Sequence, residues 1–393
     1  MPTAVVQLDI SRTLPEVLVD EKYTQAFVVV RRLGTPVAQF YLPVCAGRLD
    51  MEAAARMLLG KVESYRWRWE VEDYLGPNPS GPRQAATVAV CTRERPDDLV
   101  RALSAIGMLR PAPVEVLVID NNPTTSRTRE VVARFPHVRY VREDRPGLDA
   151  ARNRALKEAT APVVAFTDDD AAPEPAWLEH LLPAFDDPLV MCATGLTLPL
   201  ELETAAQEWF ERFTPFGRGF NRRVFDGIHH DPLSVSGAGA GANMALRRSV
   251  LERVGAFDEA LDAGTATKSG GDHEMFGRLL AGGYRIVYEP RAVSWHRHRR
   301  TWEELREALH GYGVGVYALW TRRLFVEREL GVLRHAYRWF RRSQGPALWR
   351  ALRRRPHSVP LDLIVAELRG CFAGPRAYFI ARRRLRSRVA CRA

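Results

Sequence analysis

Between residues 85 and 185, short apolar runs alternate with stretches in which apolar residues recur at helical spacing. The runs are almost continuously apolar, which is typical of strands covered on both faces. Strands that alternate with helices indicate an α/β fold with a mostly parallel sheet. The predicted strands are 87–92, 114–120, 138–143 and 162–170, and the predicted helices are 96–109, about 125–134, about 149–159 and 176–185.

The first 80 residues have a different pattern, and we expect a small α+β domain there. Apolar runs at 26–32 and 38–44 predict the two strands of a hairpin. The spacing over 51–62 predicts a helix. The segment Gly76–Pro82 is rich in glycine and proline and predicts a linker to the next domain.

From residue 301 onward the chain is predicted to be helical. Thr301 followed by Glu304 fits a capping box, in which each side chain bonds the backbone of the other residue. We therefore expect three parts: a small N-terminal domain (1–80), a central α/β domain (85–310) and a helical C-terminal region (311–393).

The net charge of +10 is distributed very unevenly. Residues 331–393 contain 16 arginines against two acids, Asp362 and Glu367, so the rest of the chain is mildly acidic. A basic tail predicts an anionic partner for the tail alone. A solvated charged surface is the alternative, and the sequence leaves both open.

The remaining composition favours a globular protein that is not embedded in a membrane. Hydrophobic residues make up 46% and charged residues 26% of the chain, and no apolar run approaches the roughly 18 residues of a spanning helix. The N-terminus lacks the basic and apolar regions of a signal peptide. Five cysteines form no CxxC pair, which argues against a zinc site or a disulfide framework. These features predict a cytoplasmic location.

Three acids, Asp168, Asp169 and Asp170, directly follow the last of the four apolar strands. Adjacent carboxylates repel one another unless a cation neutralises them, and oxygen ligands suit Mg²⁺ or Mn²⁺. Ligands of parallel sheets bind beyond the carboxyl ends of the strands, so the run predicts a metal site. Aspartate also favours turns and helix starts, which is the alternative.

Other candidates rest on weaker signals. Asp120 ends the second strand and could bind a ribose or a base, or simply stabilise a turn. Asp272 follows two glycines and could act as a general base or cap the next helix. His296 could complete a carboxylate metal site or be structural. The run Gly237–Gly241 lacks the context of a dinucleotide fingerprint and indicates only a close backbone approach to a ligand.

In their order along the chain, these motifs resemble glycosyltransferase family 2, a large family of inverting enzymes with the GT-A fold. The similarity covers roughly residues 85–310. Seven motifs in the family's order are far more specific than any one of them. They are TVAVCTRERP, VLVIDNNP, GLDAARNRAL, VVAFTDDDAAP, GANMALRRSVLERVGAFDE, GGDHEMFGRLL and YEPRAVSWHRHR.

The resemblance implies a Rossmann-like sheet with helices on both faces and the transfer of a sugar from a nucleotide-sugar to an acceptor hydroxyl. Thr92, Arg93 and Asp120 match positions that cradle the base and ribose of the nucleotide. Arg152 matches a residue that contacts the nucleotide. UDP is the first expectation for that nucleotide, and GDP the second.

The same resemblance implies the metal and the base. Asp168 and Asp170 match the ends of the family's DxD motif, which holds Mn²⁺ or Mg²⁺ and the donor's diphosphate. Asp169, between them, is expected at the donor site as well. His296 matches a late histidine that completes the metal site in some relatives. Asp272 matches the catalytic base, which deprotonates the acceptor hydroxyl.

Two departures from the family pattern stand out. The family often has Glu-Asp at the base motif, whereas Gly271 precedes Asp272 here. Processive members carry a Gln-x-x-Arg-Trp motif that this chain lacks, although Leu319–Arg323 is nearby. Together with the absence of a predicted spanning helix, the second departure argues against a polymerising synthase.

Two other functions fit less well. A sugar-nucleotide pyrophosphorylase would carry a glycine-rich phosphate loop after the first strand, where this chain has CTRERPDD. A non-catalytic nucleotide-sugar-binding protein would need neither the DxD acids nor Asp272. No nucleic-acid motif accompanies the basic tail, so we expect no nucleic-acid partner. The acceptor is left open as a glycan, a lipid-linked compound or a small molecule.

The C-terminal tail mixes arginine clusters with apolar residues, as do segments that lie on anionic bilayers. That would place the protein at the periphery of the inner membrane face and suit a lipid-linked acceptor. A helix packed on the catalytic domain is the equal alternative. The candidate anchors are Leu363, Ile364, Val365, Leu368, Phe372, Tyr378, Phe379 and Ile380.

Overall fold

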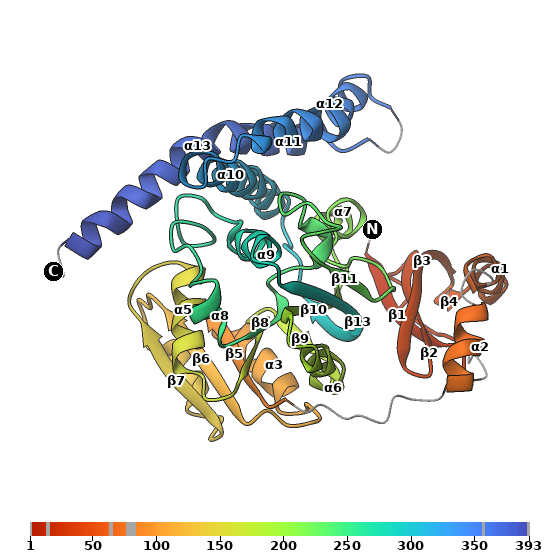
Figure 1. Ribbon diagram of the computed structural model, residues 1–393. Helices are drawn as coiled ribbons and strands as arrows, with labels where there is room; N and C mark the ends of the chain where they lie inside the picture. Colours follow the sequence, from red (N-terminus) through yellow and green to blue (C-terminus); the bar gives the residue numbers. More distant parts are fainter. Residues whose placement is uncertain (1, 13–15, 63–65, 76–83, 356–357, 391–393) are drawn as a thin grey trace.

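A large central sheet organises the molecule (Figure 1). The computed structural model describes residues 2–12, 16–62, 66–75, 84–355 and 358–390. Across the sheet the strands follow the order β11 (Arg223–Phe225), β13 (Arg285–His296), β10 (Val190–Pro199), β12 (Asn243–Arg247), β8 (Val163–Asp168), β5 (Ala86–Thr92), β6 (Glu115–Asn121) and β7 (Val138–Glu143).

The four predicted strands are β5, β6, β7 and β8, and all four run parallel as neighbours. Strands β10 and β13 are also parallel to each other, whereas β12 is antiparallel to both of its neighbours. The predicted α/β fold with a mostly parallel sheet is therefore confirmed. Strand β8 ends at Asp168, two residues earlier than predicted, so Asp169 and Asp170 form the turn to β9 (Ala171–Pro173), which pairs with β13.

Helices cover both faces of this sheet. Val88, Val90 and Val118 pack with helices on one face, while Ala89 and Leu117 pack with helices on the other. This alternation follows from the two-residue repeat of a strand, and burial of both sets explains the continuous apolar runs. The first face carries α3 (Pro96–Ile106), α4 (Arg127–Val132) and α6 (Trp177–Leu181), and the second carries α5 (Leu148–Glu158) and α9 (Gly271–Ala281).

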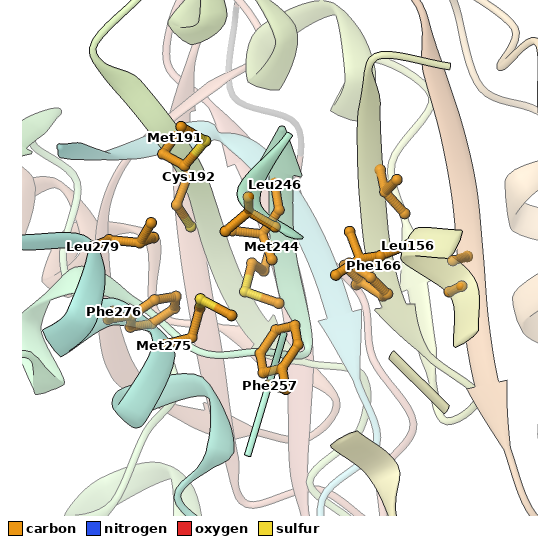
Figure 2. Close-up of a cluster of buried hydrophobic side chains, with 14 of the residues drawn as sticks. Leu156, Phe166, Met191, Cys192, Met244, Leu246, Phe257, Met275, Phe276 and Leu279 are labelled. Carbon is orange, nitrogen blue, oxygen red and sulfur yellow. The ribbon is translucent and has the colours of Figure 1, made fainter. Parts of the chain in front are cut away.

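The core on the second face fixes the helix that carries Asp272. Figure 2 shows Met275, Phe276 and Leu279 of α9 facing Met244 and other side chains of the sheet. All four are almost fully buried. Burial of these three large apolar side chains in the middle of α9 holds its first turn at a fixed place above the sheet.

The N-terminal domain contains a second sheet. The predicted hairpin is present, because β2 (Gln25–Arg32) and β3 (Thr35–Cys45) pair antiparallel. The predicted helix is α1 (Met51–Val62). The pattern did not indicate β1 (Thr3–Asp9), which pairs parallel with β2, nor the two-residue β4 (Arg48–Leu49) or α2 (Arg66–Leu75).

This domain packs against the central sheet. Phe27 and Val29 of β2 share a buried cluster with Leu196 and Leu198 of β10. The backbone N–H of Thr3 donates to the carbonyl of Leu202 at 2.8 Å. The predicted linker at 76–82 lies outside the described residues.

The C-terminal region is helical, as predicted. Thr301 and Glu304 form the predicted capping box at the start of α10 (Trp302–Val326). Helix α13 (Leu361–Ala390) packs along α10. The contact is close because Gly313, Gly370 and Gly374 have no Cβ, and a Cβ at any of the three would clash with the other helix. In the sequence, α10 and α13 are separated by α11 (Gly331–Trp339), a π-helical turn (Phe340–Gln344) and α12 (Gly345–Leu352). None of the described helices is both long enough and apolar enough to span a membrane.

This packing corrects the list of candidate membrane anchors. Leu363, Ile364 and Tyr378 are buried within the protein, so their assignment as bilayer anchors was wrong. Val365 and Leu368 are half-buried, and only Phe372, Phe379 and Ile380 are exposed. The apolar residues of α13 mainly serve its contact with α10 and with the cavity below.

Candidate functional site

Three predicted site residues end neighbouring strands at one edge of the sheet. In the ladders Cys91 pairs with Asp168, and Thr92 pairs with Asp120. The strands are parallel, so their carboxyl ends meet at the same edge. The structure therefore brings Asp168, Thr92 and Asp120 to the edge where sheets of this kind bind ligands.

Asp168, Asp170 and His296 lie together as predicted, because β13 pairs with β9 beside the acids. One ligand atom from each lies within 4.8 Å of the others. Nε2 of His296 is 3.1 Å from Oδ1 of Asp170, a buried oxygen that accepts no hydrogen bond from the described residues. Octahedral ligands at about 2.1 Å from Mg²⁺ or Mn²⁺ span up to about 4.2 Å. The three side chains thus fit a single cation after small rotations.

Positive groups surround the acids. Nη1 of Arg95 lies 2.8 Å from Oδ2 of Asp170, and Nη1 of Arg299 lies 3.5 Å from the same oxygen. Burial would raise the pKa of Asp170, but His296, Arg95 and Arg299 outweigh burial and lower it. Sequence analysis missed Arg95 because no pattern separates it from its neighbour Arg93.

Asp169 is not among the three grouped ligand residues. It accepts a hydrogen bond from Oγ1 of Thr92 at 2.7 Å, and Arg95 lies 3.2 Å away. Burial and the nearby charge of Asp170 raise the pKa of Asp169 to about 7. In the structure Asp169 therefore joins β5 to β8 at the sheet edge.

The other predicted nucleotide contacts lie further along the edge. Asp120 is buried and accepts a hydrogen bond from the Tyr140 hydroxyl at 2.8 Å. Arg93 is exposed at the end of β5. Neither these two residues nor Thr92 line the cavity that contains Asp272, so a nucleotide held by them would lie beside that cavity.

Asp272 occupies the first turn of α9, two residues after the N-cap Gly270, which has the left-handed conformation. Its Oδ2 accepts from the Gly241 N–H and its Oδ1 from its neighbour His273, both at 2.8 Å. Burial would raise the pKa of Asp272, but His273, Arg152 and these N–H groups lower it. The side chain is therefore a carboxylate, and each oxygen retains a lone pair for a substrate hydroxyl.

The glycine-rich run Gly237–Gly241 approaches protein side chains closely, and its approach to a ligand stays a prediction. A Cβ on Gly241 would lie 2.5 Å from Nη2 of Arg152 and 3.2 Å from Cβ of Asp272. The run therefore lets the backbone of Gly241 reach Asp272 closely enough to donate its hydrogen bond.

Arg152 is buried between two acids. Its Nη1 lies 3.1 Å from Asp149 and 2.7 Å from Asp262. Burial, followed by repulsion from Asp262, raises the pKa of Asp149 well above its usual range. The two ion pairs give Arg152 a structural role. Arg152 also lines the cavity, as does Asp168, and its contact with a nucleotide stays a prediction.

Asp149 also accounts for the glycine at the base motif. A Cβ on Gly271 would lie 2.0 Å from Oδ2 of Asp149. The carboxyl group of Asp149 thus occupies the space that a side chain at position 271 would need. A carboxyl group therefore lies beside the base motif, but it comes from Asp149 of α5 and not from position 271.

Gly271→Ala should destabilise the protein by about 1–3 kcal/mol, because the methyl group would displace a fully buried carboxyl group. Urea unfolding measures the change. Gly60→Ala in α1 is the control, since a Cβ there meets nothing within 4 Å, and it should be neutral or stabilise by up to about 1 kcal/mol. Equal effects of the two substitutions would show that position 271 is not crowded.

A cavity of about 700 Å³ joins several of these groups. Asp168, Asp272 and Arg152 line it together with Arg218 and Arg299. Its other wall comes from the C-terminal helices α10 and α13 and from α7 (Ala205–Phe213), which lie above the sheet edge in Figure 1. Its size is typical of a small-molecule site.

The cavity lies beside the carboxyl ends of the strands, where open α/β sheets bind their ligands. Residues 87–255 match the model of glycosyl transferase family 2. This match covers most of the central α/β domain and agrees with the order of the motifs along the chain.

Curated relatives share part of the chain. A pre-mycofactocin glycosyltransferase of Mycobacterium tuberculosis is 29% identical over 239 residues, or 59% of this chain and 47% of the relative. A glucosyl-dolichyl phosphate glucuronosyltransferase of Haloferax volcanii is 26% identical, over 44% of this chain and 55% of the relative. The chain thus spans about half the length of the curated relatives it matches.

Among solved structures, a mannosyltransferase of Pyrobaculum calidifontis in complex with GDP-Man and Mn²⁺ aligns with a TM-score of 0.48 at 19% identity. The alignment covers 84% of this chain and 96% of that one.

Proposed function

We propose that this protein is a metal-dependent inverting glycosyltransferase that transfers a sugar from a nucleotide-sugar to an acceptor hydroxyl. One observation carries the proposal: Asp168 of the candidate metal cluster and the ionised Asp272 line the same cavity. A metal-ligand carboxylate and a candidate base on one cavity suit a reaction in which the leaving group and the acceptor need separate assistance.

Asp168, Asp170 and His296 would hold Mn²⁺ or Mg²⁺, and the bound cation would neutralise charge that develops on the leaving nucleoside diphosphate. Asp272 would accept the proton of the acceptor hydroxyl while the oxygen of that hydroxyl attacks the anomeric carbon of the donor sugar. The bond to the diphosphate breaks as the new glycosidic bond forms, and this single displacement inverts the anomeric centre.

Arg218 is a further candidate for the diphosphate. Its guanidinium group lines the cavity and donates to the backbone carbonyl of Ser236 at 2.6 Å. Among the described residues it forms no ion pair with an acid. A cation near Asp272 without an acidic partner is suited to an anionic substrate group.

The nucleotide can be identified with the purified protein. Thermal unfolding is measured with UDP, GDP and other nucleoside diphosphates in the presence of Mn²⁺. A ligand at about 100 times its Kd adds about 2.7 kcal/mol of stability, and we expect UDP first and GDP second. Transfer or slow hydrolysis of the matching nucleotide-sugar must follow. Binding without any turnover would favour a nucleotide-sugar-binding protein and overturn the proposal.

A contact with anionic membrane remains part of the proposal, but the structure suggests a different surface for it. Leu330, Leu333, Tyr337 and Phe340 are exposed at three- and four-residue spacing, and so form an apolar stripe along α11. Arginines at positions 334, 338, 341 and 342 lie between and beside them. An exposed apolar stripe flanked by arginines suits an anionic bilayer, and one relative acts on a dolichyl phosphate compound by its name.

The protein should pellet with anionic vesicles at low salt and not with neutral ones, because each arginine near the surface adds about 1 kcal/mol that salt screens. Replacing both Leu333 and Tyr337 with serine should weaken binding at least about tenfold, through lost apolar burial. Ile228→Ser, on a different exposed apolar residue, is the control. If the protein fails to pellet at low salt, the arginine-flanked stripe has another role.

A further inference from the structure

The cavity beside Asp272 has two chemically different ends. Near the sheet edge it is lined by charged groups, among them Asp168, Asp272 and Arg299. Away from the sheet its wall is apolar. Residues of this apolar arm include Trp209, Leu305, Leu309, Val316, Leu319 and Leu363.

Most of the apolar arm is built by α10 and α13, which follow the matched family region that ends at residue 255. Leu305, Leu309 and Leu319 come from α10 and are almost fully buried in the protein. Trp209, from α7, also lines the cavity and makes a T-shaped contact with Trp302. The arm is therefore built mainly by the part of the chain that follows the matched region, and α7 adds one wall from within that region.

Tyr312 connects the two ends. Its ring lines the cavity one turn after Leu309. Burial, together with the negative charges of Asp272, Asp170 and Asp168, raises the pKa of Tyr312 to about 12. The phenol of Tyr312 therefore feels the charges of these carboxylates. A ligand whose apolar group occupies the arm could place its hydroxyl next to the candidate base Asp272.

The chemistry of the arm selects against a free oligosaccharide. Every buried sugar hydroxyl without a hydrogen-bond partner costs about 1–3 kcal/mol. Polar side chains on the C-terminal helices at this cavity are few, and Ser343 and Glu367 are those of α13 and the π-helical turn. An aryl or alkyl group, in contrast, gains about 25 cal/mol for each Å² that it removes from water.

We infer that the apolar arm binds the acceptor, and that the acceptor carries its hydroxyl next to an aryl or short alkyl group. This inference rests on the proposed function, because it uses Asp272 as the base. The total volume of about 700 Å³ also has to admit the donor sugar. The apolar group is therefore one ring or a short chain, and a longer lipid would have to extend out of the cavity.

Binding is tested with pairs of glycosides that share one sugar and differ only in a methyl, phenyl or octyl group, the last below its micellar concentration. Trp209 and Trp339 line the cavity, so tryptophan fluorescence reports occupancy in the presence of UDP or GDP and Mn²⁺. We expect the phenyl and octyl compounds to bind at least about tenfold more tightly than the methyl compound. Equal affinities would overturn the inference.

Two nearly isosteric substitutions locate the effect. Val316→Thr and Leu309→Asn should each reduce the preference for phenyl or octyl over methyl at least about fivefold, and should leave the thermal shift by the nucleotide unchanged. Leu59→Asn, at an exposed leucine of α1, is the control. An unchanged preference in both cavity variants would place the ligand elsewhere and overturn the inference.

The outcomes separate the two proposals. If nucleotide and apolar glycosides bind but no sugar is transferred from any donor, the proposed function fails while the arm stands as an apolar binding site. If transfer occurs to methyl and phenyl acceptors with the same KM, the proposed function stands and the apolar acceptor is wrong. If the phenyl glycoside binds tightly and the octyl glycoside does not bind, the acceptor is a small aromatic compound. If the octyl glycoside binds tightly and the phenyl glycoside does not, the acceptor is a lipid.

Discussion

Asp272→Asn should reduce sugar transfer by about 10²–10⁴-fold, the usual contribution of a general base, and should leave nucleotide binding nearly unchanged. The amide keeps the shape of the side chain, and its one oxygen can still accept from the N–H group of Gly241 or of His273, which donate to different oxygens of the carboxylate. It cannot accept the acceptor's proton. The loss should therefore appear in kcat and kcat/KM, while the thermal shift by the nucleoside diphosphate and Mn²⁺ is retained.

Asp226→Asn is the matched control, because this aspartate also accepts backbone N–H bonds, from Ile228 and His229, but lies away from the cavity. It should not change turnover. Retained turnover in Asp272→Asn would assign the base to another acid. Glu274 is a poor replacement, since its carboxylate is buried in ion pairs with Arg278 and Arg322.

The strands at the core of the fold could be predicted because each is buried on both faces and is therefore apolar along its whole length. The pattern predicted β5 and β8 within a few residues. It did not predict β12, which lies between β8 and β10 and is antiparallel to both. Strand order depends on contacts between segments far apart in the chain, and periodicity carries only local information.

The candidate metal cluster was predictable for a related reason. Asp168 and Asp170 are adjacent to a recognisable strand, and the family resemblance added His296 from more than 100 residues away. Arg95 and Asp149 were not predictable, because an isolated arginine or aspartate has no distinctive pattern. Their roles exist only through the places that the fold gives them, next to Asp170 and Gly271.

The tail shows the opposite limit. Apolar residues and arginines along α13 suit a bilayer surface and a packed helix equally well. The glycines at 313, 370 and 374 allow α13 to lie directly on α10, and this packing buries part of the apolar set. The exposed stripe instead lies on α11, where the sequence analysis named no anchor.

Asp170→Asn and His296→Gln should each abolish the stabilisation by Mn²⁺ and reduce transfer by about 10³-fold or more, since metal-assisted departure of the diphosphate is worth several kcal/mol. Both side chains are within the group whose ligand atoms lie inside 4.8 Å. The direct measurement is thermal unfolding against Mn²⁺ concentration, with and without the nucleoside diphosphate.

Asp169→Asn is the control within the same acidic run. Asp169 bonds Thr92 and Arg95 and is not a member of the cluster, so this variant should retain the Mn²⁺-dependent shift whatever happens to its turnover. An equal loss of the shift in all three variants would mean that Mn²⁺ binding does not distinguish the predicted ligands from their neighbour Asp169. Retention in all three would place the cation elsewhere. At a pH above the pKa of Asp169, which is about 7, loss confined to Asp170→Asn and His296→Gln is expected only if these two side chains ligate the cation directly, because Asp169 is then ionised one residue away.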